Sequence, residues 1–202
     1  INTTYTSVNT TAGFSVSQYT GTGSDATVGH GLGVIPKIVF YKRLDSGANW
    51  VVQSPLMGNK VQLVLNDATA GNTDSRLGAT DNWTNQVFTV GTYGDMNANG
   101  GTYVAYAFAD IKGYSKFSTY EGNGSNDGTF VYTGFKPAFL ITKRVDTGND
   151  NWHILDSARD IDNPAEKVLQ TNEADAEGTT SSSKVDFLSN GFKCRGTGAS
   201  IN

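Results

Sequence analysis

The sequence predicts an all-β protein built from two tandem homologous β-sandwich domains, jelly-roll-like or lectin-like in type. Composition is the first reason: 24 glycines and abundant Thr, Ser and Asn favour short strands joined by tight turns. Periodicity is the second, because short runs alternate apolar and polar residues, and no segment keeps a helical period over about twelve residues. The third reason is an internal repeat.

Residues 120–144 repeat residues 19–43. Eight identities keep a single spacing of 101 residues: Tyr19/Tyr120, Gly21/Gly122, Gly23/Gly124, Ser24/Ser125, Gly33/Gly134, Pro36/Pro137, Lys42/Lys143 and Arg43/Arg144. A repeat of about a hundred residues is too long for a solenoid and suits a small domain. We therefore expect residues 1–12 to be an N-terminal linker or donated strand, residues 13–112 the first repeat, and residues 113–202 the second.

The first repeat contains most of the clear strand signals. Strands are expected at residues 14–19, 34–43, 50–52, 61–65, 83–90 and 102–108. The run 34–43 is the strongest, and Pro36 should lie at its start, where no ladder donor is required. In the second repeat, residues 163–169 (NPAEKVL) are the best candidate for a helical turn, with Asn163 as cap and Pro164 in the first helical position.

The second repeat lacks a counterpart of the strand predicted at residues 102–108. The segment 3–8 (TTYTSV) precedes the first repeat just as TYVAYAF precedes the second, and it shares the Thr-Tyr start. We hypothesise that this N-terminal segment completes the sheet of the second repeat, either within one chain or in the next subunit, since an open apolar edge invites aggregation. The simpler alternatives are a truncated chain or a short edge.

Several motifs together carry a family resemblance. They are Y-x-G-x-G-S, G-[LF]-x-[IK]-P before an apolar strand ending in Lys-Arg, and the phrases TYVAYAFADIKGYSKFSTYEGNGSNDG and DSARDIDNPAEK. From about residue 13 to residue 202 the chain resembles a domain of unknown function found in tandem in virion structural proteins of marine tailed bacteriophages, including cyanophages. The resemblance supplies biological context, and it assigns no catalytic or binding residue.

The resemblance implies a non-enzymatic virion protein, such as a tail fibre, appendage or decoration component, that serves assembly, host-surface adhesion or both. It implies a location in the virion after assembly in the host cytoplasm. The expected partners are other virion proteins, further copies of the chain in a homo-oligomer (a trimer or a strand-exchanged assembly), and a host surface glycan. No heptad pattern that would enforce a trimer is visible in the sequence.

Composition argues against other classes of partner. A net charge of −4 with 17% charged residues leaves no basic stripe for nucleic acid. No apolar run approaches the roughly 18 residues of a transmembrane helix, so membrane insertion is not expected. The single cysteine, Cys194, rules out an intrachain disulfide, and no cofactor is predicted.

Two alternative functions stay open. In a lectin-like carbohydrate-binding module, Trp50 and Trp152 would stack on sugar rings if they are exposed, although a tryptophan repeated on a repeated strand is more typical of a core. A polysaccharide-degrading enzyme would need a pair of carboxylates, and the repeat holds no such pair. No catalytic residue is predicted.

The remaining candidate residues are acids and histidines. Asp156, Asp160 and Asp162 form the densest oxygen cluster and are calcium candidates, but Arg159 lies among them and also suits a surface Asp–Arg pair. His30 and His153 are not repeated between the two halves. We therefore interpret both as structural or surface residues and not as a feature of the module.

Overall fold

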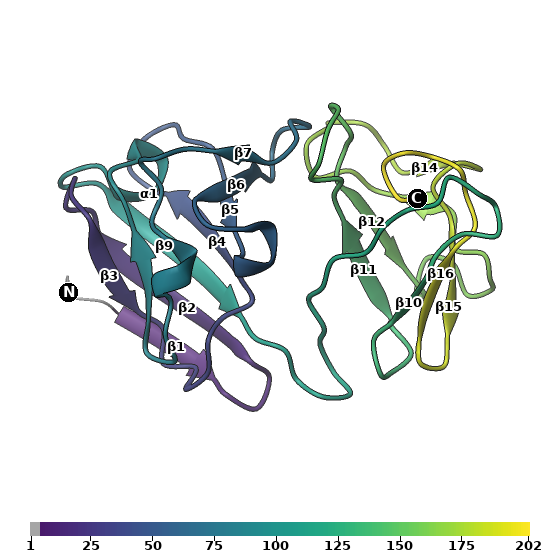
Figure 1. Cartoon of the computed structure of the whole chain (residues 1–202), viewed down its shortest axis with the longest axis horizontal. Coiled ribbons are helices and arrows are strands. Elements are labelled where there is room, and N and C mark those ends of the chain that lie inside the picture. Colours follow the sequence, from purple (N-terminus) through teal and green to yellow (C-terminus); the bar gives the residue numbers. More distant parts are fainter. Residues whose placement is uncertain (1–4) are drawn as a thin grey trace. The chain divides into compact units, whose positions relative to one another are not determined.

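The computed structural model of the chain describes residues 5–202 and is mostly β, with several antiparallel sheets, as the sequence predicts (Figure 1). The chain divides into two compact units. The first runs up to Leu65 and continues over Gly71–Phe117, and the second consists of Asn66–Ala70 and Ser118–Asn202. No helix within residues 5–202 is long and apolar enough to cross a membrane.

The first unit contains a seven-stranded sheet with the order β1-β2-β9-β4-β5-β6-β7 and a two-stranded ribbon, β3-β8. The bounds are β1 (Tyr5–Asn9), β2 (Phe14–Thr20), β3 (Ala26–Gly29), β4 (Ile38–Arg43), β5 (Val51–Gln53), β6 (Val61–Val64), β7 (Asn72–Thr73), β8 (Val87–Val90) and β9 (Thr102–Phe108). Three single turns of helix, η1 (Pro55–Met57), η2 (Thr80–Asn82) and α1 (Gly94–Asn97), connect them.

Alternation along β9 explains why this strand is central. Tyr103, Ala105 and Ala107 are buried, whereas the residues between them are partly exposed. The small alanines allow the core residues of the ribbon, among them Phe88, to pack closely on this face. Strand β9 pairs antiparallel with both β2 and β4, so a strand from the end of the unit joins two from its beginning.

The second unit is made of shorter sheets, β10-β16-β15, β11-β12 and β13-β14. The bounds are β10 (Phe130–Tyr132), β11 (Phe139–Thr142), β12 (His153–Asp156), β13 (Lys167–Val168), β14 (Gly178–Thr179), β15 (Val185–Leu188) and β16 (Gly191–Cys194). Its core gathers mainly Val131, Leu155, Val185, Phe187 and Phe192.

The same contacts occur inside each of the two units at the repeated positions. The hydroxyl of Tyr19 donates to the carbonyl of Met96 at 2.6 Å, and the hydroxyl of Tyr120 donates to the carbonyl of Ile201 at 2.6 Å. After the repeated Lys-Arg, Arg43 pairs with Asp45 and Arg144 pairs with Asp146, each with Nε to Oδ1 at 2.8 Å. The repeated residues therefore brace the same turns in both units.

A buried asparagine that the sequence comparison did not pair also recurs. Oδ1 of Asn97 accepts from the backbone N–H of Thr22 at 2.8 Å, and its Nδ2 donates to the carbonyl of Ser24 at 2.7 Å. In the second unit, Oδ1 of Asn202 accepts from Asn123 at 3.0 Å and its Nδ2 donates to Ser125 at 2.7 Å. Each asparagine thus ties the glycine-rich turn to a segment that lies 75 or 79 residues further along the same unit.

One sequence prediction is wrong in the structure. Residues 163–169 form no helical turn, because the Asn163 side chain pairs with the backbone of Phe187, and Lys167–Val168 forms β13. Within the proposed donor segment, Tyr5–Asn9 forms β1, which pairs along its length with β2 of the first unit. The rest of the proposed donor segment, residues 3 and 4, lies outside the described residues.

Candidate functional site

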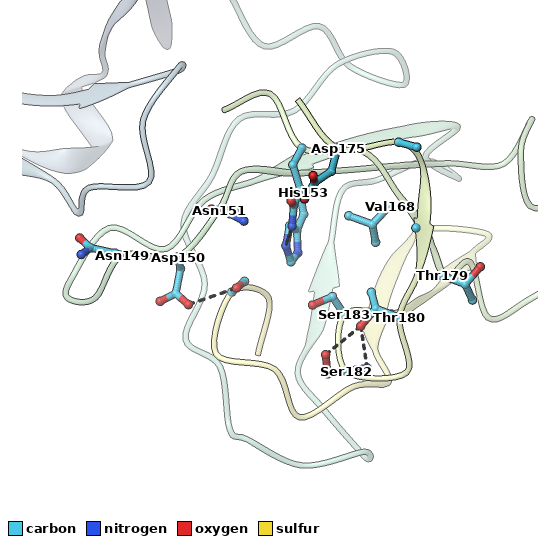
Figure 2. Close-up of a pocket in the computed structure, with 14 residues that line it drawn as sticks. Asn149, Asp150, Asn151, His153, Val168, Asp175, Thr179, Thr180, Ser182 and Ser183 are labelled. Carbon is cyan, nitrogen blue, oxygen red and sulfur yellow. Dashed lines mark hydrogen bonds between the residues drawn. The ribbon is translucent and has the colours of Figure 1, made fainter. Parts of the chain in front are cut away.

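The second unit holds a polar cavity of about 390 Å³ (Figure 2). Its wall is formed by the start of β12, the β13–β14 region and the loops at Ser182, Ser183 and Ser200. Amide, hydroxyl and carboxylate side chains dominate this lining, and Val168 is an apolar exception. Binding pockets for small molecules start at about 300 Å³, so the cavity can hold a ligand the size of a small sugar.

His153 is the central side chain of this cavity. Its side chain lies among the labelled lining residues in Figure 2, and the residue is only 5% exposed. The amide nitrogen of Gln170 lies 3.3 Å from Nε2, while Nδ1 is buried and has no hydrogen-bond partner among residues 5–202. The buried ring therefore keeps one nitrogen, Nδ1, whose hydrogen-bonding capacity is not used within the described part of the chain.

The imidazole of His153 is neutral near pH 7. Burial lowers the pKa of His153 below its usual 6.5, and the nearby Asp150 carboxylate opposes this shift less strongly. A neutral imidazole offers a directed hydrogen bond and no net positive charge. The site is therefore better suited to hydroxyl groups than to phosphate or carboxylate.

Several other polar side chains of the cavity are joined by hydrogen bonds. Ser200 Oγ donates to Asp150 Oδ1 at 3.1 Å, and the hydroxyls of Thr180 and Ser182 lie 2.9 Å apart (Figure 2). Each of these oxygens keeps further capacity to bond. These side chains line the same cavity as His153.

The cavity marks a difference between the two units. In the first unit the facing residues of β4 and β5 are Tyr41 and Val51, both fully buried. The corresponding pair of β11 and β12 is Thr142 and His153, and within the described part of the chain the hydroxyl of Thr142 also lacks a hydrogen-bond partner. A large apolar pair in one unit is thus replaced by a smaller polar pair in the other.

Comparison with known proteins places the whole chain in one family. Residues 1–202 match the family described as "Domain of unknown function (DUF7483)". The chain belongs to this family. The match spans both units, so one family domain includes the entire duplication. No curated protein and no solved structure matches the chain.

The tryptophans proposed for sugar stacking are not open platforms. Trp152 is 4% exposed and therefore cannot present a ring face to a glycan. Trp50 is partly buried, its ring stacks on Tyr106 with centroids 6.1 Å apart, and Lys42 Nζ lies 5.8 Å from its centre. Trp152 is thus a buried core residue, whereas Trp50 stays partly exposed beside Tyr106.

The calcium candidates do not converge on a cation site. Asp156 accepts from the Arg159 guanidinium at 2.6 Å, and this hydrogen bond lowers the pKa of Asp156. Asp160 Oδ2 accepts from the backbone N–H groups of Glu166 and Lys167. Asp162 is exposed, and no group of three metal-ligating side chains occurs among residues 5–202. The first two acids therefore brace turns of the second unit.

The histidines differ in what they do. His30 is fully buried, and both of its ring nitrogens are engaged, with the carbonyl of Thr84 at 3.2 Å and the N–H of Leu32 at 3.1 Å. It is a structural residue of the first unit. Our sequence interpretation grouped His153 with it and missed the cavity, although the signal was present: His153 stands where the first repeat has Val51.

Proposed function

We propose that this chain is a non-enzymatic structural component of a phage virion, in a tail fibre, appendage or decoration protein, made of two tandem sandwich-like modules. The observation that carries the proposal is the duplication itself, in which the Tyr19 and Tyr120 bonds and the Asn97 and Asn202 bonds recur. An active site rarely needs two adjacent copies, whereas assembly and multivalent adhesion gain from repetition. The virion context rests on the family resemblance of the sequence.

The proposal predicts that the protein is found in purified particles. Antibodies raised against the chain should label one appendage or surface of intact phage in electron microscopy, and the protein should sediment with particles through a density gradient. Labelling in the lysate but never on particles would contradict it. A particle lacking the genome but carrying the label would still support a structural role.

The polar cavity favours a second candidate function, binding of a neutral carbohydrate. Nδ1 of His153 has no hydrogen-bond partner among residues 5–202, and the lining of the same cavity includes the oxygens of Thr180, Ser182 and Asp150. A sugar presents many hydroxyls that both donate and accept, so it complements this mixture without a net charge. This function would make the second unit the adhesive one.

A glycan array with wild type and His153→Val tests the carbohydrate site. The valine restores the residue type of the first unit, and we expect about tenfold weaker binding, which corresponds to roughly one hydrogen bond. Asn99→Ala, an exposed polar change in the first unit, is the control and should bind as wild type does. Equal binding by all three proteins, or no glycan bound by wild type, would rule the site out.

A further inference from the structure

One edge of β11 has no strand beside it in the part of the chain that the structure describes. Strand β11 pairs with β12 on one side, and these two strands form a sheet by themselves. In the first unit the corresponding strand is β4. It pairs with β5 on one side and, over the whole of Ile38–Arg43, with β9 on the other. In the first unit, therefore, an antiparallel strand covers the edge that corresponds to the open edge of β11.

The open edge is apolar. Phe139 is 59% exposed, whereas Ile38, its counterpart in the first unit, lies opposite Phe108 of β9 and is partly buried. No residue of Phe139–Thr142 carries a charge. An exposed, uncharged strand edge with unpaired backbone groups is a template for pairing with another strand.

Strand β1 has the matching open edge. It is the outermost strand of the seven-stranded sheet, and its only ladder among residues 5–202 is with β2. All five residues are exposed, with Tyr5 at 74% and Val8 at 43%, and none is charged. Because β1 and β9 are both antiparallel to β2, they run in the same direction.

We propose that β1 of a second copy of this chain pairs antiparallel with the open edge of β11, in the place that β9 takes beside β4. Strand β1 keeps its pairing with β2, so no strand leaves its own unit. The pairing goes beyond the proposed virion role and stands on the sheet geometry alone. It would join the first unit of one copy to the second unit of the next.

The faces of the two strands fix the register. Thr6 and Val8 lie on the inner face of β1, because Thr6 Oγ1 is 3.0 Å from the hydroxyl of buried Ser17. Ser17 in turn lies opposite the buried Ala105 of β9. On β11, Leu140 packs against the core of the second unit. In the first unit, Ala105 and Ala107 of β9 lie opposite Tyr41 and Val39 of β4. The same register between β1 and β11 places Thr6 opposite Thr142, Val8 opposite Leu140 and Ser7 opposite Ile141.

Pairing of this kind is head-to-tail, because the two edges belong to different units. A heterologous contact leaves one free β1 and one free β11 edge in each pair of copies, so it continues into a ring or a filament. Such a repeating contact is what an assembly protein of an elongated or ring-shaped structure requires.

A cysteine cross-link tests both the partner and the register. The Ser7→Cys protein is mixed with the Ile141→Cys protein under mild oxidation. Residues directly opposite on antiparallel strands lie about 4.5 to 5.5 Å apart at Cα, which suits a disulfide. The native Cys194 is buried in both proteins. We expect several-fold more mixed disulfide dimer on a non-reducing gel than with the control mixture of Ser7→Cys and Tyr132→Cys, in which Tyr132 is 66% exposed on β10.

A second measurement, the mass of the protein in solution, tests the same contact without a cysteine variant. The wild-type mass in solution should rise with concentration, and Phe139→Lys should suppress this rise, while Ile161→Lys, at an 89% exposed position outside β11 and β12, should not. Equal cross-linking in the test and control mixtures would overturn the proposal. So would a wild-type mass that stays monomeric at every concentration. Neither result would bear on whether the protein is found in particles.

Discussion

Replacing Asn97 with alanine is expected to lower the free energy of unfolding of the first unit by about 3 kcal/mol. The side chain is 1% exposed, and it accepts from Thr22 and donates to Ser24 and to the carbonyl of Gly91, the last at 2.6 Å. Alanine removes these bonds and deprives the buried carbonyl of Gly91 of its side-chain donor, and the loss of a buried partner costs more than the net value of a hydrogen bond.

Amide hydrogen exchange localises this effect to the first unit. Peptides covering β2 and β9 should lose protection in Asn97→Ala, and those covering β15 and β16 should keep it. Asn97→Asp is the informative second variant, because the carboxylate still accepts from Thr22 but cannot donate to Ser24 or Gly91. Asn99→Ala is the neighbouring control. If Asn97→Ala and Asn99→Ala unfold alike, the asparagine is not the brace that its contacts indicate.

Replacing Phe88 with alanine is expected to destabilise the first unit by about 4 kcal/mol. Phe88 is fully buried, and its ring contacts Tyr41 edge-on with centroids 5.5 Å apart, Trp83 at 6.2 Å and His30 at 6.3 Å. The truncation leaves a cavity in the middle of three aromatic partners that are fixed by the ribbon and the sheet. Such a cavity collapses only in part, so the loss exceeds the transfer energy of the ring.

Denaturant unfolding followed by tryptophan fluorescence measures this loss, since Trp83 reports on the site directly. Phe192→Ala is the matched change in the second unit, where the ring lies edge-on to Tyr120 at 5.7 Å. Tyr114→Ala, at a 66% exposed residue, is the control for removal of an aromatic ring without a cavity. A Phe88→Ala midpoint equal to that of Tyr114→Ala would show that the ribbon repacks around the gap.

The repeated turns were predictable from the sequence because their causes are local. Gly33 and Gly134 both have positive φ, at 75° and 84°, a conformation that glycine adopts without strain. The Arg43–Asp45 and Arg144–Asp146 pairs lie two residues apart in the chain. Spacing, turn residues and strand alternation therefore determined the β class and the duplication.

The cavity could be predicted only in part. The absence of His153 from the first repeat was visible, but the sequence gives no means of knowing that Thr142 faces it or that Gln170 contacts Nε2. These residues are 11 and 17 positions away, and they meet through the pairing of β11 with β12 and the return of β13. Burial of Trp152 and the pairing of Asp156 with Arg159 were likewise open alternatives in the sequence.

By itself, the sequence determined that the chain is β-rich and repeats one module at a spacing of 101 residues. Only the tertiary structure decided which strand covers which edge: β9 lies between β2 and β4, β1 stays beside β2, and β11 is left open. The physical reason is that strand pairing satisfies backbone groups, which every residue carries, so side-chain patterns select a strand's face but not its neighbour.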